Sequence, residues 1–244
     1  LGLLYHYKYE FEKAKECFNK YLTQGKEETK LNEVQELIKA CDSGIDLVMN
    51  PLDLDIIELG GNINSKYTEH SPLVTADLKT LIFTSKRKGT GGLKDENGDY
   101  YEDIYISHFE NGDWTEPVSI SSNINTDDHE ASSGLAYDGR TLFLYKPTQM
   151  GDLFVSYLKN DVWSDPESLG PYINSASRET HATISIDGQK LYFTSERPGG
   201  FGGLDIYMSE IQEDGSWGPA TNLGAEINSE LNEEGPYIHP SDTV

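Results

Sequence analysis

The chain has 244 residues, of which 36% are hydrophobic and 11% aromatic, and it contains 23 glycines and ten prolines. This composition excludes an intrinsically disordered chain and favours a turn-rich β-architecture over most of the length. The formal net charge is −23: residues 1–50 hold 7 basic and 9 acidic side chains (−2), and residues 51–244 hold 12 and 33 (−21). An acidic surface of this kind repels nucleic acid and anionic lipid headgroups, so neither a nucleic-acid partner nor direct membrane insertion is expected.

Apolar residues at helical spacing predict an amphipathic helix over residues 4–22: Leu4, Phe11, Ala14, Phe18 and Leu22. Gly25 is expected to follow its end. A second apolar series predicts a helix over residues 31–41, and a third short stretch, residues 45–49, is expected to stop before Pro51. The two cysteines, Cys17 and Cys41, lie in this part without metal-binding spacing, so they are expected to be buried thiols or a disulfide pair.

The start of the chain resembles a tetratricopeptide repeat. Leu1-Gly2, Tyr5, Ala14 and Phe18 fall where that motif has its Leu-Gly, Tyr, Ala and Phe, although Lys26 stands near the place of its usual proline. The resemblance implies a tetratricopeptide-like domain over residues 1–50 that begins before residue 1. The alternative interpretation is an isolated amphipathic hairpin that caps the next domain.

Residues 51–244 contain one repeated pattern. Four phrases align, and their isoleucines are 61, 49 and 54 residues apart: Asn62-Ile63-Asn64-Ser65, Asn123-Ile124-Asn125-Thr126, Tyr172-Ile173-Asn174-Ser175 and Glu226-Ile227-Asn228-Ser229. Five residues after the second Asn position of each phrase stands a glutamate: Glu69, Glu130, Glu179 and Glu233. A turn aspartate follows each glutamate: Asp77, Asp138, Asp187 and Asp242. Periods of this length indicate repeated supersecondary units.

Each complete unit reads as four short strands. An apolar run follows each of the first three turns, as in Leu81-Ile82-Phe83, and each unit closes with a tryptophan and a nearby proline, as in Trp114 and Pro117. Apolar runs are expected where both faces of a strand are covered, and four-stranded units of this period are typical of propeller blades. The fold class is therefore predicted as mainly β: a β-propeller of four-stranded blades, incomplete in this chain, after a small all-α segment.

Residues 56–59 resemble the final strands of the later units, which include Val118-Ser119 and Glu167-Ser168. We expect these residues to form an outer strand without a blade of its own, which would complete the last blade of a closed ring. Residues 51–244 are thus predicted to hold this strand, three full blades and the start of a fourth. The natural protein is expected to be longer at both ends.

The blade units resemble TolB-type propeller repeats. The phrase that carries the resemblance runs from Ile184 through Asp187-Gly188 to Leu191-Tyr192-Phe193-Thr194-Ser195, and Arg197-Pro198-Gly199-Gly200 follows it. The first blade departs from it through Leu78 and an insertion at residues 88–102, and the second lacks the Arg-Pro-Gly-Gly stretch.

A tetratricopeptide segment before such blades is similar to envelope proteins of the outer-membrane-protein-A family, including the PorE-like subunit of type IX secretion and gliding machinery. The resemblance implies a periplasmic, outer-membrane-associated scaffold whose partners are envelope or secretion proteins. It implies peptidoglycan contact only through a domain that these residues do not contain.

The recurring glutamates have two interpretations. Glu69, Glu130, Glu179 and Glu233 could form a ring of carboxylates around a central channel and bind a cation or a basic peptide. Alternatively, each caps a turn by accepting bonds from backbone N–H groups, and recurrence in every blade favours this role.

The loop at residues 95–103 is rich in oxygen ligands of the kind calcium prefers, and its candidate ligands are Asp95, Asn97, Asp99 and Glu102. It does not fit the EF-hand spacing, and a solvated loop is the alternative. Histidines are scattered without a metal-binding pair: His6, His70, His108, His129, His181 and His239. No cofactor is expected.

Repeat architecture without a nucleophile elbow or a phosphate-binding loop favours a non-catalytic interaction module. Its partner-binding candidates are loop aromatics, Tyr100, Tyr101 and Phe201. The alternative is the substrate-selecting propeller of a glycan- or peptide-processing enzyme, because the abundant acids allow a catalytic carboxylate pair.

Overall fold

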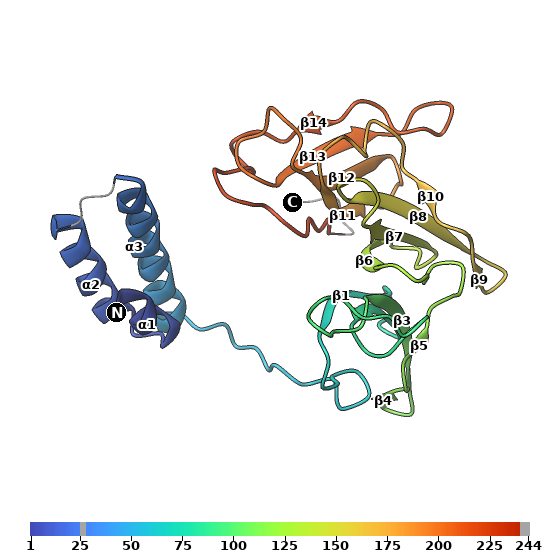
Figure 1. The fold of residues 1–244 in the computed structure, drawn as a ribbon, viewed down its shortest axis with the longest axis horizontal. Helices are drawn as coiled ribbons and strands as arrows, with labels where there is room; N and C mark the ends of the chain where they lie inside the picture. Colours follow the sequence, from blue (N-terminus) through green and yellow to red (C-terminus); the bar gives the residue numbers. More distant parts are fainter. Residues whose placement is uncertain (25–27, 240–244) are drawn as a thin grey trace. The chain divides into compact units, whose positions relative to one another are not determined.

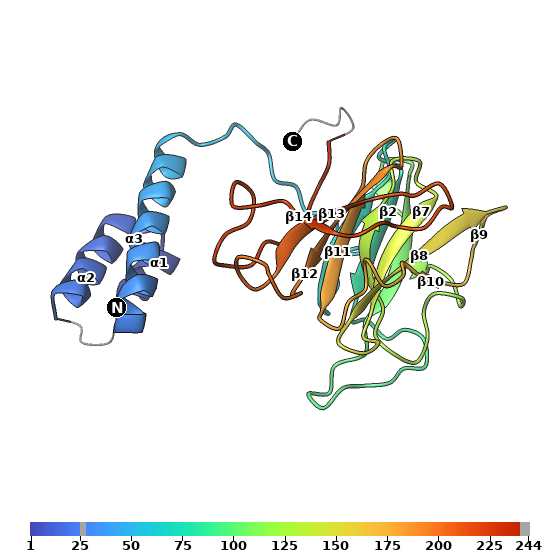
Figure 2. The ribbon, with the colours of Figure 1, turned by 90° about the horizontal axis from the view of Figure 1, so that it is seen from above.

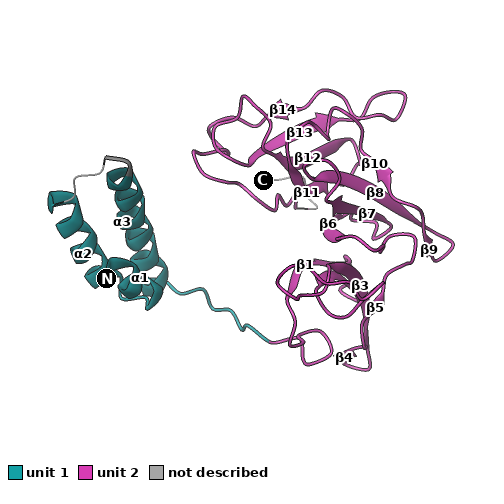
Figure 3. Cartoon of the chain, viewed as in Figure 1, with its two compact units in different colours: residues 1–57 teal, residues 58–244 magenta. Residues whose placement is uncertain are grey.

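The computed structural model describes residues 1–24 and 28–239. The chain divides into two compact units, residues 1–57 and residues 58–244, and each is described by itself (Figure 3). The first unit is helical, and the second consists of antiparallel sheets. Among the described residues, no helix is both long enough and apolar enough to span a bilayer.

The helical unit contains three helices, α1 (Gly2–Tyr7), α2 (Phe11–Gln24) and α3 (Glu28–Met49). The prediction of one helix through residues 4–22 is wrong, because the chain turns between α1 and α2. Tyr9 has a φ of 58°, and the backbone N–H groups of Lys8 and Glu10 both donate to the carbonyl of Tyr5. The predicted helices at residues 31–41 and 45–49 are one continuous helix, α3. Gly25, the predicted stop, lies outside the described residues.

Two glycines allow the helices to approach closely. A Cβ atom on Gly2 would lie 2.5 Å from the Phe18 ring, and one on Gly44 would lie 2.6 Å from the Phe11 ring. Gly44 lowers the intrinsic helix propensity of α3, but the contact that it permits is tertiary and outweighs the local preference. Cys41 is buried, and both it and Cys17 are free thiols rather than a disulfide pair.

The second unit contains three antiparallel sheets in succession (Figures 1 and 2). Blade 1 consists of β1 (Glu69–Val74), β2 (Thr80–Ser85), β3 (Asp103–Glu110), β4 (Asp113–Trp114) and β5 (Val118–Ser119). Blade 2 consists of β6 (Ala131–Leu135), β7 (Thr141–Lys146), β8 (Asp152–Lys159), β9 (Val162–Trp163) and β10 (Glu167–Ser168). Blade 3 consists of β11 (Glu179–Ile184), β12 (Lys190–Ser195), β13 (Asp205–Glu210) and β14 (Thr221–Asn222).

The blades share one topology. The first three strands of each pair in chain order, and a two-residue final strand pairs back onto the third: β5 on β3, β10 on β8 and β14 on β13. The turn between the first and second strands holds the predicted aspartate, whose carboxylate accepts the backbone N–H two residues on, as at Asp77, Asp138 and Asp187. Asp242, the fourth predicted turn residue, lies outside the described residues. The first strands β1, β6 and β11 are neighbours and form the innermost layer.

Two clusters of buried side chains join the blades. One joins blade 1 to blade 2 and consists of Ile82, Ile104, Ile124, Leu142, Leu144 and Trp163. The other joins blade 2 to blade 3 and includes Phe143, Leu153, Val155, Leu191, Phe193 and Tyr207. Successive residues of a strand point to opposite faces, so each apolar second strand is buried on both sides. The described residues therefore form a mainly β, blade-by-blade propeller segment beside a small helical unit.

Residues 51–59 form no strand in the structure, and the side chains of Ile56 and Ile57 are 99% and 79% exposed. In the later repeats the corresponding residues are the final strands, paired with the third strand of the blade before them. None of the described residues pairs with residues 56–59 in this way. The outer strand stays a prediction.

Candidate binding site on the axis of the blades

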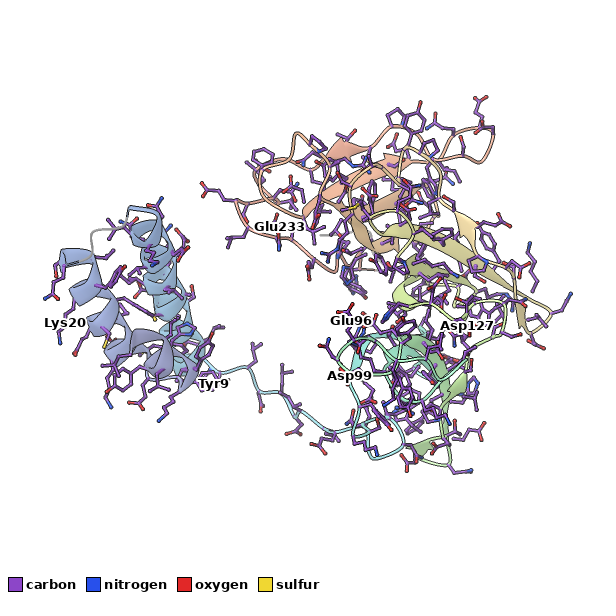
Figure 4. The ribbon with its side chains drawn as sticks, in the orientation of Figure 1. Tyr9, Lys20, Glu96, Asp99, Asp127 and Glu233 are labelled. Carbon is purple, nitrogen blue, oxygen red and sulfur yellow. The ribbon has the colours of Figure 1, made fainter. Side chains whose placement is uncertain are left out.

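The recurring glutamates cap the turns that precede the innermost strands. The hydroxyl and backbone N–H of the preceding Ser or Thr donate to each of the first three carboxylates, and the hydroxyl of Ser229 donates to the fourth. The backbone N–H of Thr126 lies 2.9 Å from Glu130 Oε2, and that of Ser175 lies 2.9 Å from Glu179 Oε2. These carboxylates are thus directed at their own turns; Figure 4 labels Glu233 at the fourth.

A basic side chain lies over three of these carboxylates. The nitrogen–oxygen distances are 3.2 Å for Arg87–Glu69, 3.1 Å for Lys146–Glu130 and 3.5 Å for Arg197–Glu179. Burial acts to raise the pKa of Glu69, but bonds from Ser65, Ser85 and Arg87 outweigh it, and the pKa lies below its usual value. The charge of these acids is therefore balanced inside each blade.

The predicted calcium loop closes on itself. Asp95 accepts the backbone N–H groups of Asn97 and Asp99 at 2.9 and 3.0 Å, and Lys94 pairs with Tyr100 in an isolated β-bridge. Glu102 instead forms an ion pair with Lys86, and ring nitrogens of His70 and His129 lie 3.5 and 3.6 Å from its carboxylate. Across residues 1–24 and 28–239, no group of three or more His, Cys, Asp or Glu side chains is placed to hold a metal ion.

Polar side chains gather where the innermost strands begin. Glu102 lies between His70 Nε2 at 3.5 Å, Lys86 Nζ at 3.8 Å and His129 Nδ1 at 3.6 Å. The hydrogen bond with His70 is the main reason that the pKa of Glu102 lies below its usual value. We call the polar end of the axis the group formed by Glu102, its three neighbours and three residues of blade 3, which are Arg178, His181 and Glu196.

Blade 3 contributes Arg178, Glu196 and His181 to the polar end. Arg178 Nη1 lies 3.6 Å from Glu196 Oε1. Burial lowers the pKa of His181, and the Glu234 carboxylate only partly offsets this. The polar end therefore combines acids, a guanidinium, an ammonium group and imidazoles from three successive blades.

An apolar groove of about 600 Å³ lies where the innermost strands end. Its lining includes Leu73, Val74, Leu135, Ile184, Tyr237 and Ile238. Strands β6 and β11 approach closely beneath the groove, and the glycine at position 134 permits this. A Cβ atom there would lie 1.8 Å from the backbone oxygen of Ala182. The extended segment at residues 236–239 supplies one wall. Apolar clefts of this volume are typical ligand sites.

The three aromatic partner-binding candidates have different surroundings. Tyr100 is half-buried beside the Tyr67 ring, at a centroid distance of 5.9 Å. Tyr101 stacks on the His129 ring at 4.2 Å. Phe201 is 51% exposed at a loop that Asp205 holds through the backbone N–H groups of Phe201 and Gly202. The structure does not bring the three together into one group through any contact of the described residues.

The sequence reasoning missed the groove. A usable signal was present, because an apolar residue stands three positions before each of the first three turn aspartates: Val74, Leu135 and Ile184. These residues end the innermost strands, and their equivalent positions place them around the same axis. A repeat-by-repeat reading of that position could have identified the groove.

No family model matches the sequence, and no curated protein matches it. Among solved structures, TolB from Acinetobacter baumannii is 16% identical with a TM-score of 0.42, covering 69% of this chain and 35% of that one. A putative TolB from Agrobacterium tumefaciens is 17% identical with a TM-score of 0.42, covering 72% and 68%. A puromycin-hydrolysing peptidase from Mycobacterium tuberculosis is 10% identical with a TM-score of 0.44, covering 65% and 23%.

The matched region of this chain spans about a third of the length of the Acinetobacter TolB. The structural neighbours thus include TolB proteins together with a puromycin-hydrolysing peptidase. By its own sheets, their common topology and their shared buried clusters, the chain is a segment of a β-propeller preceded by a helical unit.

Proposed function

We propose that the blade unit is a non-catalytic protein-binding module that holds an extended apolar segment of a partner protein in the axial groove. The groove is the observation that carries this proposal. Its volume of about 600 Å³ and its apolar lining suit a few residues of extended chain. Tyr237 and Ile238 of this chain already lie along one wall, so the surface accepts an extended apolar segment.

The exposed rim of the groove favours a partner of this kind. Leu78, Tyr137 and Ile186 lie at the turns and are exposed, with Leu78 reaching 69%. Aromatic and aliphatic side chains around a cleft supply most of the binding free energy in protein interfaces. The acidic charge of residues 51–244, −21 with 12 basic and 33 acidic residues, favours a partner with basic residues beside the apolar segment.

The finer proposal concerns the cellular setting. The TolB-type repeat pattern after a tetratricopeptide-like helix supports a periplasmic scaffold associated with the outer membrane. Its partners would then be proteins of a secretion or gliding complex of the PorE-like kind, and peptidoglycan would be contacted through another domain. The helical unit would offer a second surface for a partner protein.

A random dodecapeptide library displayed on phage tests the groove. Selected peptides are expected to be apolar with flanking basic residues, and the Ile186→Asp variant should lose them. Val162→Asp is the matched control, because Val162 is exposed in the same unit but lies outside the groove. Equal binding by Ile186→Asp, or loss with Val162→Asp, contradicts the proposal.

Incubation of the full chain with cell-wall glycan and peptide substrates separates this proposal from the enzymatic alternative. We expect no turnover. A product that forms with the wild-type chain and disappears when the groove is blocked by a selected peptide would favour the substrate-selecting role instead.

Photo-crosslinking in cells tests the proposed cellular setting. A photo-crosslinking residue at position 186 is expected to capture an envelope protein.

A further inference from the structure

The groove is walled by the edges of three sheets. The innermost strands β1, β6 and β11 are neighbours (Figure 1), and each is the terminal strand of its sheet, with a hydrogen-bonded strand on one side only. The open side of such a strand presents backbone N–H and C=O groups. Val74, Leu135 and Ile184 end these strands and line the groove, so they bring main-chain groups to it as well as apolar side chains.

The strand register in blade 3 fixes the direction of these groups. The backbone N–H of Ser185 donates to the carbonyl of Lys190 at 2.8 Å, so these two residues form a hydrogen-bonded pair of the ladder. Hydrogen-bonded and non-hydrogen-bonded pairs alternate between antiparallel strands. The adjacent pair, Ile184 with Leu191, is therefore a non-hydrogen-bonded pair. The N–H and C=O of Ile184 point away from β12, toward the open edge of β11.

The other two blades have the same register at this place. The equivalent backbone bonds run from the N–H of Thr75 to the carbonyl of Thr80 at 3.0 Å, and from the N–H of Ala136 to the carbonyl of Thr141 at 2.9 Å. Val74 and Leu135 precede these donors, so their N–H and C=O groups also point to an open edge. Among residues 1–24 and 28–239, the main-chain groups of Val74, Leu135 and Ile184 have no hydrogen-bond partner.

Open main-chain groups in an apolar groove restrict what can fill it. A purely apolar occupant would remove water from these groups without replacing its hydrogen bonds, at a free-energy cost for each group. An extended peptide instead turns one N–H and one C=O toward a strand edge at every second residue, while its side chains contact the walls. Residues 236–239 line the groove without bonding to Val74, Leu135 or Ile184, so these groups stay open to a partner.

From this arrangement we propose that the partner segment binds as an added β-strand, whose main chain pairs with the open edge of one innermost strand at Val74, Leu135 or Ile184. The inference rests on the proposed function of the groove and names its mode of recognition. Main-chain bonds supply affinity in this mode, and the side chains at alternate positions supply specificity. The partner sequence should therefore alternate apolar with polar residues and have no proline at a bonding position.

An ester scan of the peptide tests this mode of binding. The probes are phage-selected dodecapeptides that the full chain binds and the Ile186→Asp variant does not. Each backbone N–H is replaced in turn by an ester oxygen, and the Kd is measured by calorimetry. Replacement at every second position should weaken binding roughly threefold to tenfold, the effect of one hydrogen bond. Replacement at the intervening positions of the same peptide should leave the Kd unchanged, because those N–H groups face away from the edge.

Hydrogen exchange of the wild-type chain shows which edge is used. With saturating peptide, the backbone amide of Val74, Leu135 or Ile184 should gain at least about tenfold in protection, because it becomes hydrogen-bonded. The amide of Val162, which is exposed in the same unit outside the groove, should not change.

The outcomes separate this inference from the proposed function. Peptides that need the groove but tolerate every ester replacement, or lose affinity without a two-residue period, overturn the added strand and leave groove binding intact. Unchanged protection at all three amides with bound peptide also overturns the added strand. A library that yields no peptide dependent on Ile186 overturns both.

Discussion

The side-chain amide of Asn125 bonds the backbone of Ile104 in both directions. Its Oδ1 accepts the Ile104 N–H at 2.9 Å, and its Nδ2 donates to the Ile104 carbonyl at 2.8 Å. Asn174 bonds Leu153 in the same way, and Asn228 bonds Ile206. The recurring asparagine therefore ties each blade to the third strand of the blade before it, which explains its place in the repeat.

Replacing Asn125 by alanine should destabilise the blade unit strongly. The substitution leaves the buried N–H of Ile104 without a partner, while the Ile104 carbonyl keeps the N–H of Ile120 at 3.1 Å. We expect a cost of about 1–3 kcal/mol in the free energy of unfolding. Asn64 is the matched control, because it holds the same place in the first repeat but is exposed. Urea denaturation measures both variants, and an Asn64→Ala loss as large as that of Asn125→Ala would contradict this account.

Replacing Gly134 by alanine should force β6 away from β11. The new Cβ atom would lie 1.8 Å from the backbone oxygen of Ala182, and a backbone atom cannot turn aside as a flexible side chain can. We expect a loss of at least about 2 kcal/mol, the range of overpacked interiors. Gly61→Ala, where no neighbouring atom lies within 4 Å, should leave the melting temperature nearly unchanged. Similar melting temperatures for the two variants would refute the prediction.

Replacing Arg197 by lysine should weaken blade 3 although the charge is kept. The guanidinium lies 4.9 Å from the centre of the Phe193 ring and 5.0 Å from that of Tyr207. It also donates to the carbonyls of Tyr172 and Ile173 at 3.0 and 2.6 Å. A lysine cannot form these fork-shaped and stacked contacts together, so we expect a loss of about 1–3 kcal/mol. Arg178→Lys, at the exposed polar end, is the control. Urea denaturation should show little change in the free energy of unfolding for that variant.

Acid should destabilise the blade unit through Glu69 and Glu102. Both have a folded pKa below the ordinary value of 4.5, so both stabilise the fold above about pH 4.5 and lose that contribution as the pH falls through the folded pKa. Asp103 acts in the opposite sense, because burial raises its pKa and its protonation in acid favours the folded state. Urea denaturation between about pH 7 and 3 should show falling stability with a shallower fall in Glu102→Gln. An equal slope in that variant would argue against the ion pairs.

Periodic features made the blades predictable. The recurring asparagine, glutamate, aspartate and tryptophan each form the same local or neighbouring contact in successive units, so their spacing carries the topology. The ends of the helices were harder to predict from the sequence. The turn at Tyr9 has no glycine or proline, and Gly44 lies inside a helix because it packs on Phe11. At Gly44 a tertiary contact outweighs local propensity, whereas the turn at Tyr9 is held by the bonds that the N–H groups of Lys8 and Glu10 donate to the carbonyl of Tyr5.

The chain's sequence by itself determined the class of the fold, the number of complete blades and the capping role open to the recurring acids, because these depend on residues close together or on a repeated spacing. Only the tertiary structure decided the site. The groove requires the ends of β1, β6 and β11 to lie together, and the polar end requires Glu102 to lie beside His70 and His129. These contacts join residues of different blades, so they depend on how successive sheets pack around an axis. A local sequence pattern does not specify the distance between side chains of different blades.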